Sequence, residues 1–246
     1  MTLITEKGPG MDVNDTAPTM RLAMREVREC AYRALMTKGA SNAEAQAAAR
    51  QVLFAELHHG TGLHSLAAWL HDGTWLLGAF PYTRIDTPEG KSYRVDPAAP
   101  CHALVHGVLL VDVASTGVGS EVLCSPLRHD THLLDEALLN AAISSGHTVV
   151  HRSAGPENRT TFATPAGDLG SGSSAADQGA PHTPPQDPGN SRFYTANEPP
   201  QGEFTLSTEA QRTERRLALA HGGILVDAAI WSELRAIAAG YLVPDA

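Results

Sequence analysis

Cysteine, aromatic residues and lysine are all scarce in this chain of 246 residues. The three cysteines, Cys30, Cys101 and Cys124, are an odd number at wide spacing, which argues against a disulfide framework or a cysteine zinc cluster. Aromatic residues make up only 5% of the chain, which favours helices packed on a sheet over an aromatic-rich sandwich. None of the few lysines stands where a buried Schiff-base lysine would be expected.

Positive charge and long apolar runs are also lacking. The formal net charge is −9, so the chain has no general basic surface that would hold a nucleic-acid backbone. No apolar run approaches the ~18 residues of a membrane span, and the first residues lack the basic-then-apolar pattern of a signal peptide. We therefore expect a cytoplasmic protein that contacts neither nucleic acid nor membrane.

The first part of the chain predicts a pair of helices. Residues 20–35 carry apolar side chains at helical spacing. Ser41 and Glu44 form a capping box that opens a second helix, which should run to about Leu57. Residues 1–18, which precede both helices, are expected to be a disordered tail.

Strand patterns follow the helices. Residues 82–86 and 92–96 flank a turn and predict a hairpin, and the Val/Leu-rich residues 101–115 predict a central strand. Residues 130–145 predict a helix, and residues 147–151 a strand after it. Strand, helix and strand in this order predict a βαβ unit, so the expected fold class is α/β with a small sheet.

A long Pro/Gly-rich insert divides the remainder. Residues 165–202 hold 7 of the 16 prolines and 6 of the 22 glycines, a composition that predicts a flexible linker or a lid. Residues 19–164 before it are the expected α/β core with its N-terminal helices. Residues 203–246 predict a strand-helix segment, capped by Asp227, that completes this core.

The βαβ unit also predicts a site, because ligands bind such units outside the carboxyl ends of the strands. Helix amides and two arginines there would hold a carboxylate, and a histidine would deliver a proton near neutral pH. The alternative is that these residues only cap the helix and face water. The predicted substrate-binding residues are Arg128, Arg152, Ser153 and Ser125, and the predicted catalytic residues are His129, His132 and His151.

The sequence predicts neither a metal site nor a bound cofactor. Two histidine pairs, each four residues apart in an expected strand, would be separated by about 13 Å, too far to share one ion. His129 and His132 could chelate a metal as neighbours on a helix turn, but no HExxH pattern or acidic cluster supports them. The turn around Gly117 and Gly119 lacks the third glycine of a dinucleotide fingerprint.

Two resemblances to families add further expectations. The blocks "VLCSPL", "LLDEALLNAAISSGHTVV" and "GGILVDAAIWSELRAIAAGYLVP" resemble the bacterial domain-of-unknown-function family DUF3726, which carries no activity to transfer. The segment "AEAQAAARQVLFAELHHGTGLHS" is similar to the malate and lactate dehydrogenases of the second type. This second resemblance implies a nicotinamide-dependent enzyme with His64 as its histidine, although the Asp-Ser-His-Gly pattern of that family is absent.

The residues favour a cofactor-independent enzyme that acts on a small carboxylate-bearing or amide-type metabolite, either a decarboxylase or a C–N hydrolase. One alternative is a non-catalytic accessory or scaffold subunit, in which helices 20–57 bind a partner enzyme or a second copy of the chain. The other alternative, from the resemblance, is a relic of an NAD-dependent hydroxy-acid dehydrogenase.

Overall fold

The structure is a computed structural model, and it describes most of the chain. The expected tail and residue His129 lie outside the described part. The described residues are 18–72, 75, 81–87, 90–96, 98–99, 101–117, 119–128, 131–153, 159–174 and 190–242.

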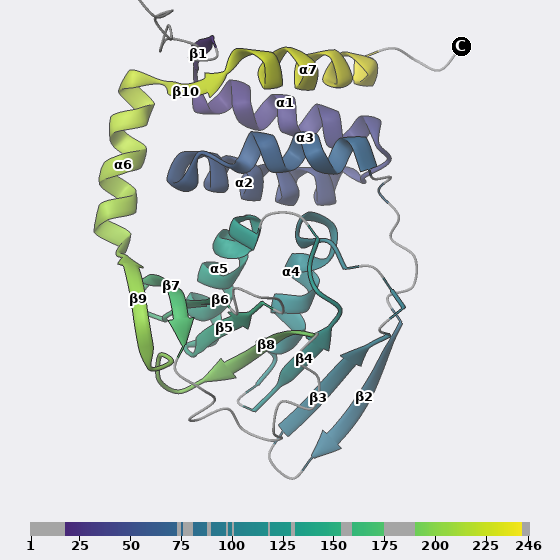
Figure 1. Ribbon diagram of the computed structural model, residues 1–246, viewed down its shortest axis with the longest axis vertical. Helices are drawn as coiled ribbons and strands as arrows, with labels where there is room; N and C mark the ends of the chain where they lie inside the picture. Colours follow the sequence, from purple (N-terminus) through teal and green to yellow (C-terminus); the bar gives the residue numbers. More distant parts are fainter. Residues whose placement is uncertain are drawn as a thin grey trace, which may run out of the picture.

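Four helices form a layer above a sheet, and two further helices lie between this layer and the sheet (Figure 1). The upper layer consists of α1 (Met24–Thr37), α2 (Asn42–His59), α3 (Gly62–Asp72) and α7 (Ala228–Ala239). Between this layer and the sheet lie α4 (Ala103–Ala114) and α5 (Asp135–Ser145), which the short 3-10 helix η1 (Thr131–Leu134) precedes. The long helix α6 (Glu209–Gly222) runs along the side of the molecule from the sheet to the upper layer, and the 3-10 helix η2 (Gly240–Leu242) follows α7.

Within the described residues, the larger sheet has eight strands in the order β2-β3-β4-β8-β5-β6-β7-β9. All neighbouring strands in it are antiparallel except β3 and β4. Its strands are β2 (Tyr82–Thr87), β3 (Gly90–Val95), β4 (Glu121–Cys124), β5 (Thr148–Arg152), β6 (Arg159–Ala163), β7 (Leu169–Ser174), β8 (Ser191–Ala196) and β9 (Gly202–Ser207). A separate antiparallel pair, β1 (Thr19–Leu22) with β10 (Ile224–Asp227), lies at one end of the upper layer, where β1 leads into α1 and β10 into α7.

Several sequence predictions are confirmed. The fold is α/β, the hairpin is β2–β3, and the Ser41 side chain and Glu44 close the capping box of α2. The helix α5 ends at Gly146 in the left-handed conformation, and the strand β5 follows. β4 and β5 are parallel to each other with the antiparallel β8 between them, so α5 does connect two parallel strands, but the first of these is β4 and not the strand predicted over residues 101–115. The sheet as a whole is mostly antiparallel and is larger than the small one that was predicted.

The prediction of a central strand over residues 101–115 is wrong, because these residues form α4. α4 packs against η1, α5 and β8, so it meets other elements on several sides. A helix that is apolar all round shows no helical periodicity, and its run of Val and Leu therefore imitates a buried strand.

The prediction of a flexible segment over residues 165–202 also fails where the structure describes that segment. β7 and β8 lie inside the sheet, and residues 175–189 are outside the described part. Small residues are needed in β7, since a Cβ on Gly170 would lie 2.3 Å from the Phe162 ring, and one on Gly172 would lie 2.0 Å from the Glu203 carbonyl oxygen. The glycines that suggested disorder therefore permit close strand packing.

The turn between α2 and α3 gives a test of the packing in the upper layer. A Cβ on Gly62 would lie 2.0 Å from the carbonyl oxygen of Val52 and 2.7 Å from the Glu56 amide nitrogen, both backbone atoms. We expect Gly62→Ala to lower the free energy of unfolding by about 1–3 kcal/mol, because the two helices must separate. Denaturant unfolding would measure this. The matched control is Gly222→Ala, where nothing lies within 4 Å; equal stability of the two variants would contradict the close approach.

Candidate functional site

A buried carboxylate lies where the upper helical layer meets the sheet. Asp135, the first residue of α5, is only 1% exposed. Its Oδ2 atom lies 2.8 Å from Nε2 of His59 and 3.3 Å from Nδ1 of His132. The two imidazole rings stack on each other, with centroids 3.7 Å apart and planes 15° apart. We call these three residues the His-Asp-His cluster.

The end of α2 brings His59 to the cluster. Gly60 adopts the left-handed conformation that ends this helix immediately after His59. The buried carboxylate of Glu56 accepts a hydrogen bond from the Leu63 amide at 2.9 Å, which fixes the tight turn into α3. The Nε atom of Arg215, on α6, donates to the carbonyl of Leu57, so a second helix holds the end of α2 in place.

His132 is oriented from both sides. Its Nε2 atom lies 3.2 Å from Nη2 of Arg159, the first residue of β6, and the Nε of Arg159 donates to Ser171 Oγ at 2.7 Å. A guanidinium can only donate, so Nε2 of His132 is the acceptor and its proton is on Nδ1. The Nδ1–H group therefore donates to Asp135, and the lone pair of Nε2 points toward Arg159.

The histidines determine the charge of Asp135. Burial by itself would raise the pKa of this carboxyl, but hydrogen bonds from His132 and His59 and their charge outweigh burial and hold the pKa below its usual 3.8. The carboxylate is therefore ionised at neutral pH. Its Oδ1 atom is buried and has no hydrogen-bond partner within the described part of the chain.

His151, a predicted catalytic residue, lies on β5 near this carboxylate but is 1% exposed. Its ring stacks on Phe193 with centroids 4.5 Å apart. Burial lowers the pKa of His151 to about 4, although Asp135 acts in the opposite direction. This histidine is therefore neutral at physiological pH and packs inside the core, where it does not contact solvent.

The remaining predicted site residues do not gather around the cluster. The exposed Arg128 pairs through its backbone with His102, and Ser125 Oγ donates to the Ala99 carbonyl. Ser153 closes the end of the β5–β6 pair through bonds with the Arg159 backbone.

Arg152 follows His151 on β5 and therefore points to the opposite face of the sheet. The arginine at the His-Asp-His cluster is Arg159, which the sequence reasoning missed together with His59 and Asp135. Asp135 is one of two acidic residues in the first turn of α5, a position that favours an acid, but no sequence signal links it to His59, 76 residues away.

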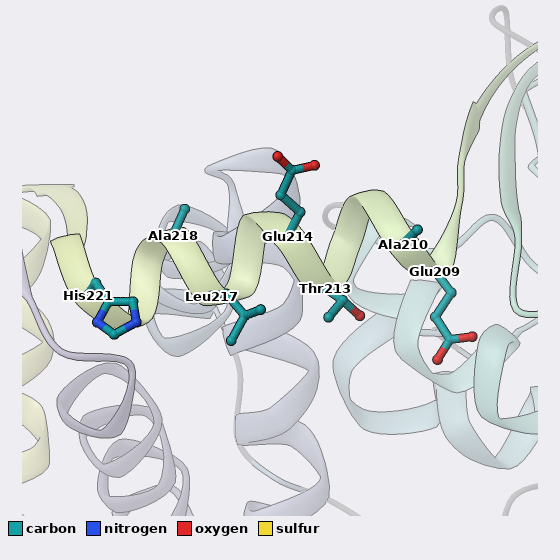
Figure 2. Close-up of a pocket in the computed structure, with 7 residues that line it drawn as sticks. All are labelled: Glu209, Ala210, Thr213, Glu214, Leu217, Ala218 and His221. Carbon is teal, nitrogen blue, oxygen red and sulfur yellow. The ribbon is translucent and has the colours of Figure 1, made fainter.

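A surface groove lies elsewhere, along the outer face of α6 (Figure 2). Its lining comes from this one helix and is mostly apolar, with Leu217 exposed in its middle. None of the residues of the His-Asp-His cluster lines it. The candidate functional site is therefore the His-Asp-His cluster and not this groove.

The fold, a helical layer over a mostly antiparallel mixed sheet, is shared with several solved structures. It is similar to malate dehydrogenase from Entamoeba histolytica, with a TM-score of 0.63 and 10% identity over 93% of this chain and 99% of that one. It is similar to malate dehydrogenase from Pyrococcus horikoshii OT3, with a TM-score of 0.61 and 13% identity over 99% and 100%. It is also similar to sulfolactate dehydrogenase from Methanocaldococcus jannaschii, with a TM-score of 0.59 and 11% identity over 90% and 97%.

These likenesses correct the predicted function. No family model and no curated protein sequence matches the chain, so the resemblance to DUF3726 has no support. The prediction of a decarboxylase or C–N hydrolase is wrong, since the structures that share this fold are dehydrogenases. Among the described helices, none is both long and apolar enough to cross a membrane.

A nicotinamide dinucleotide does not fit the glycine turn that the sequence offers. The turn leads from the end of α4 into β4, not from a strand into a helix, and the Gly117 carbonyl accepts bonds from Thr195 and Ser120. The N-termini of α2, α6 and α7 are each closed by their own capping side chains, Ser41, Thr208 and Asp227. The glycine turn and these three helix N-termini thus provide no such cradle for a pyrophosphate.

The burial of His151 predicts a pH dependence of stability. Its folded pKa of about 4 lies below the usual 6.5, so the unfolded chain binds more protons between these values, and stability is lost as the pH falls through this window. We expect about 3 kcal/mol from this residue between pH 7 and pH 4. Denaturant unfolding over this range should give a flatter profile for His151→Phe than for the unmodified chain. Parallel profiles would contradict the assignment.

Proposed function

We propose that this chain is an oxidoreductase that interconverts a small 2-hydroxy acid and the corresponding 2-oxo acid. The observation that carries the proposal is the pairing of His132 with the buried carboxylate of Asp135, beside an arginine, in a fold that resembles dehydrogenases of malate and sulfolactate. Both of these named substrates are 2-hydroxy acids, so the proposed substrate class rests on what they have in common.

Oxidation of a secondary alcohol removes a hydride from carbon and a proton from the hydroxyl group. Nε2 of His132 is suited to accept this proton once the Nη2 group of Arg159, which donates to it here, turns to the carboxylate of the acid, because the Nδ1–H group stays bound to Asp135. The ionised carboxylate would then stabilise the imidazolium that forms, and it holds the ring in the required tautomer. In the reduction direction the same imidazolium returns the proton to the oxygen atom.

Arg159 is suited to hold the carboxylate of the acid. Its Nε is anchored on Ser171 and its Nη2 faces His132, while its other N–H groups have no partner within the described residues. Guanidinium groups bind carboxylates through two parallel hydrogen bonds. A 2-hydroxy acid bound in this way would bring its hydroxyl group next to the ring that takes the proton. Since the glycine turn does not cradle a pyrophosphate, no step here is assigned to the hydride acceptor.

The test offers two kinds of electron partner. The chain is incubated with 2-oxo acids such as oxaloacetate and pyruvate together with NADH or NADPH, and with the 2-hydroxy acids together with a dye that accepts electrons. Turnover with either partner supports the proposed acid chemistry. Absence of turnover with every acid and both partners overturns it.

Variants test the assigned residues. We expect His132→Gln to lower kcat by about 10²–10⁴-fold, because the proton acceptor is lost. Arg159→Lys should mainly raise KM, since a lysine cannot make the two parallel bonds to the carboxylate. His64→Gln is the matched control, because His64 is exposed on α3 and is absent from the cluster. A large loss in His64→Gln with none in His132→Gln would show that the reaction occurs elsewhere.

A further inference from the structure

We infer that His59, His132 and Asp135 also form a binding site for a divalent transition-metal ion such as Zn²⁺ or Co²⁺. The three side chains come from the end of α2, from η1 and from the start of α5, and one ligand atom of each lies within 4.8 Å of the others. Two imidazoles and one carboxylate are a donor set that suits zinc, cobalt and ferrous iron.

The spacing of the cluster matches the edges of a coordination polyhedron. Bonds of about 2.0–2.2 Å to one metal ion place neighbouring ligand atoms about 3–3.5 Å apart. The Oδ2 atom of Asp135 lies 2.8 Å from the His59 nitrogen and 3.3 Å from the His132 nitrogen. An ion could replace the shared protons if the two stacked rings turn out of their parallel arrangement, so that the in-plane lone pairs of both nitrogens meet at one point.

Two further observations indicate a ligand at this point. The Oδ1 atom of Asp135 is buried without a hydrogen-bond partner in the described part of the chain, so its lone pairs have not been used. The side chain of His59 is 25% exposed and gives an ion a route to the carboxylate from solvent. Three protein ligands would leave at least one coordination position open to water.

Arg159 disfavours metal binding, because its N–H group stabilises the His132 tautomer that carries the proton on Nδ1. Coordination through Nδ1 of His132 requires the ring proton to move to Nε2, where it would face the N–H group of Arg159. A metal-bound histidine normally donates its second N–H to an acceptor. Arg159 must therefore swing away when the ion binds. The ion would place a proton on Nε2, the proposed proton acceptor, and displace Arg159, the proposed carboxylate clamp; this competition, unlike the binding site itself, rests on the proposed function.

Replacing Arg159 should therefore strengthen metal binding. In Arg159→Gln the amide oxygen can accept the Nε2–H bond that the metal-bound ring must donate, and the neighbouring positive charge is gone. We expect Arg159→Gln to bind the ion more tightly than the unmodified chain. His59→Gln and Asp135→Asn each remove a ligand and should bind it about 10–100-fold more weakly.

The experiment titrates the full chain with Co²⁺, followed by its visible absorption bands, and with Zn²⁺ in a calorimeter. One bound equivalent, weakened in His59→Gln and Asp135→Asn but not in His221→Gln, an exposed histidine on α6, supports the site. Equal binding by all the variants, or no binding, overturns it. Thermal unfolding of the metal-free variants shows which of them fold, and His59→Gln decides the matter if Asp135→Asn does not.

Binding is measured without substrate, which separates this inference from the proposed oxidoreductase. If Co²⁺ binds as expected and no acid is turned over, the metal site stands and the proposed function fails. If acids are turned over and neither ion binds, the proposed function stands and the metal site fails. If both hold, added Zn²⁺ should inhibit turnover of the unmodified chain.

Discussion

The buried negative charge of Asp135 constrains the structure around it. Removing a carboxylate from water is strongly unfavourable unless hydrogen bonds and opposite charge compensate. Compensation here comes from His59 and His132, and from Arg159 beyond them. These partners belong to α2, η1 and β6, so the carboxylate requires the upper helical layer, α5 and the sheet to keep their relative positions.

His151 and His132 both lie near this carboxylate, but they differ in burial and in hydrogen bonding. His151 lies fully inside the core on Phe193, and burial keeps it neutral. His132 lies nearer the surface between a carboxylate and a guanidinium, which fix its tautomer. Proximity to Asp135 alone therefore does not define a proton acceptor. The direction of the hydrogen bonds on each ring does.

Local signals predicted much of the fold. The capping box at Ser41, the left-handed Gly146 and the β2–β3 hairpin depend on short stretches of chain, and the structure has each of them. The predictions for α4 and β7 are wrong because these elements depend on tertiary packing. α4 is buried on several sides and so lacks an amphipathic pattern, and the glycines of β7 are there for close packing. Composition alone cannot distinguish such glycines from those of a loop.

The candidate site could be predicted only in part. His132 is a predicted catalytic residue that lies at the cluster, although the helix predicted from residue 130 begins as the 3-10 helix η1 and α5 itself starts only at Asp135. His59 lies in the last turn of α2, where a histidine often serves only to stabilise the end of its own helix. Its actual partner, Asp135, is distant in sequence, and Arg159 stands on a strand 27 residues after His132. Only the packing of three elements brings them together.

One oxygen atom shared by two stacked rings limits how many protons the cluster can hold. Both rings donate to the same Oδ2 of Asp135, and their centroids are 3.7 Å apart. Two imidazolium ions at this separation would repel each other strongly, whereas one is balanced by the carboxylate. The shared oxygen therefore limits the positive charge that this pair of rings can carry.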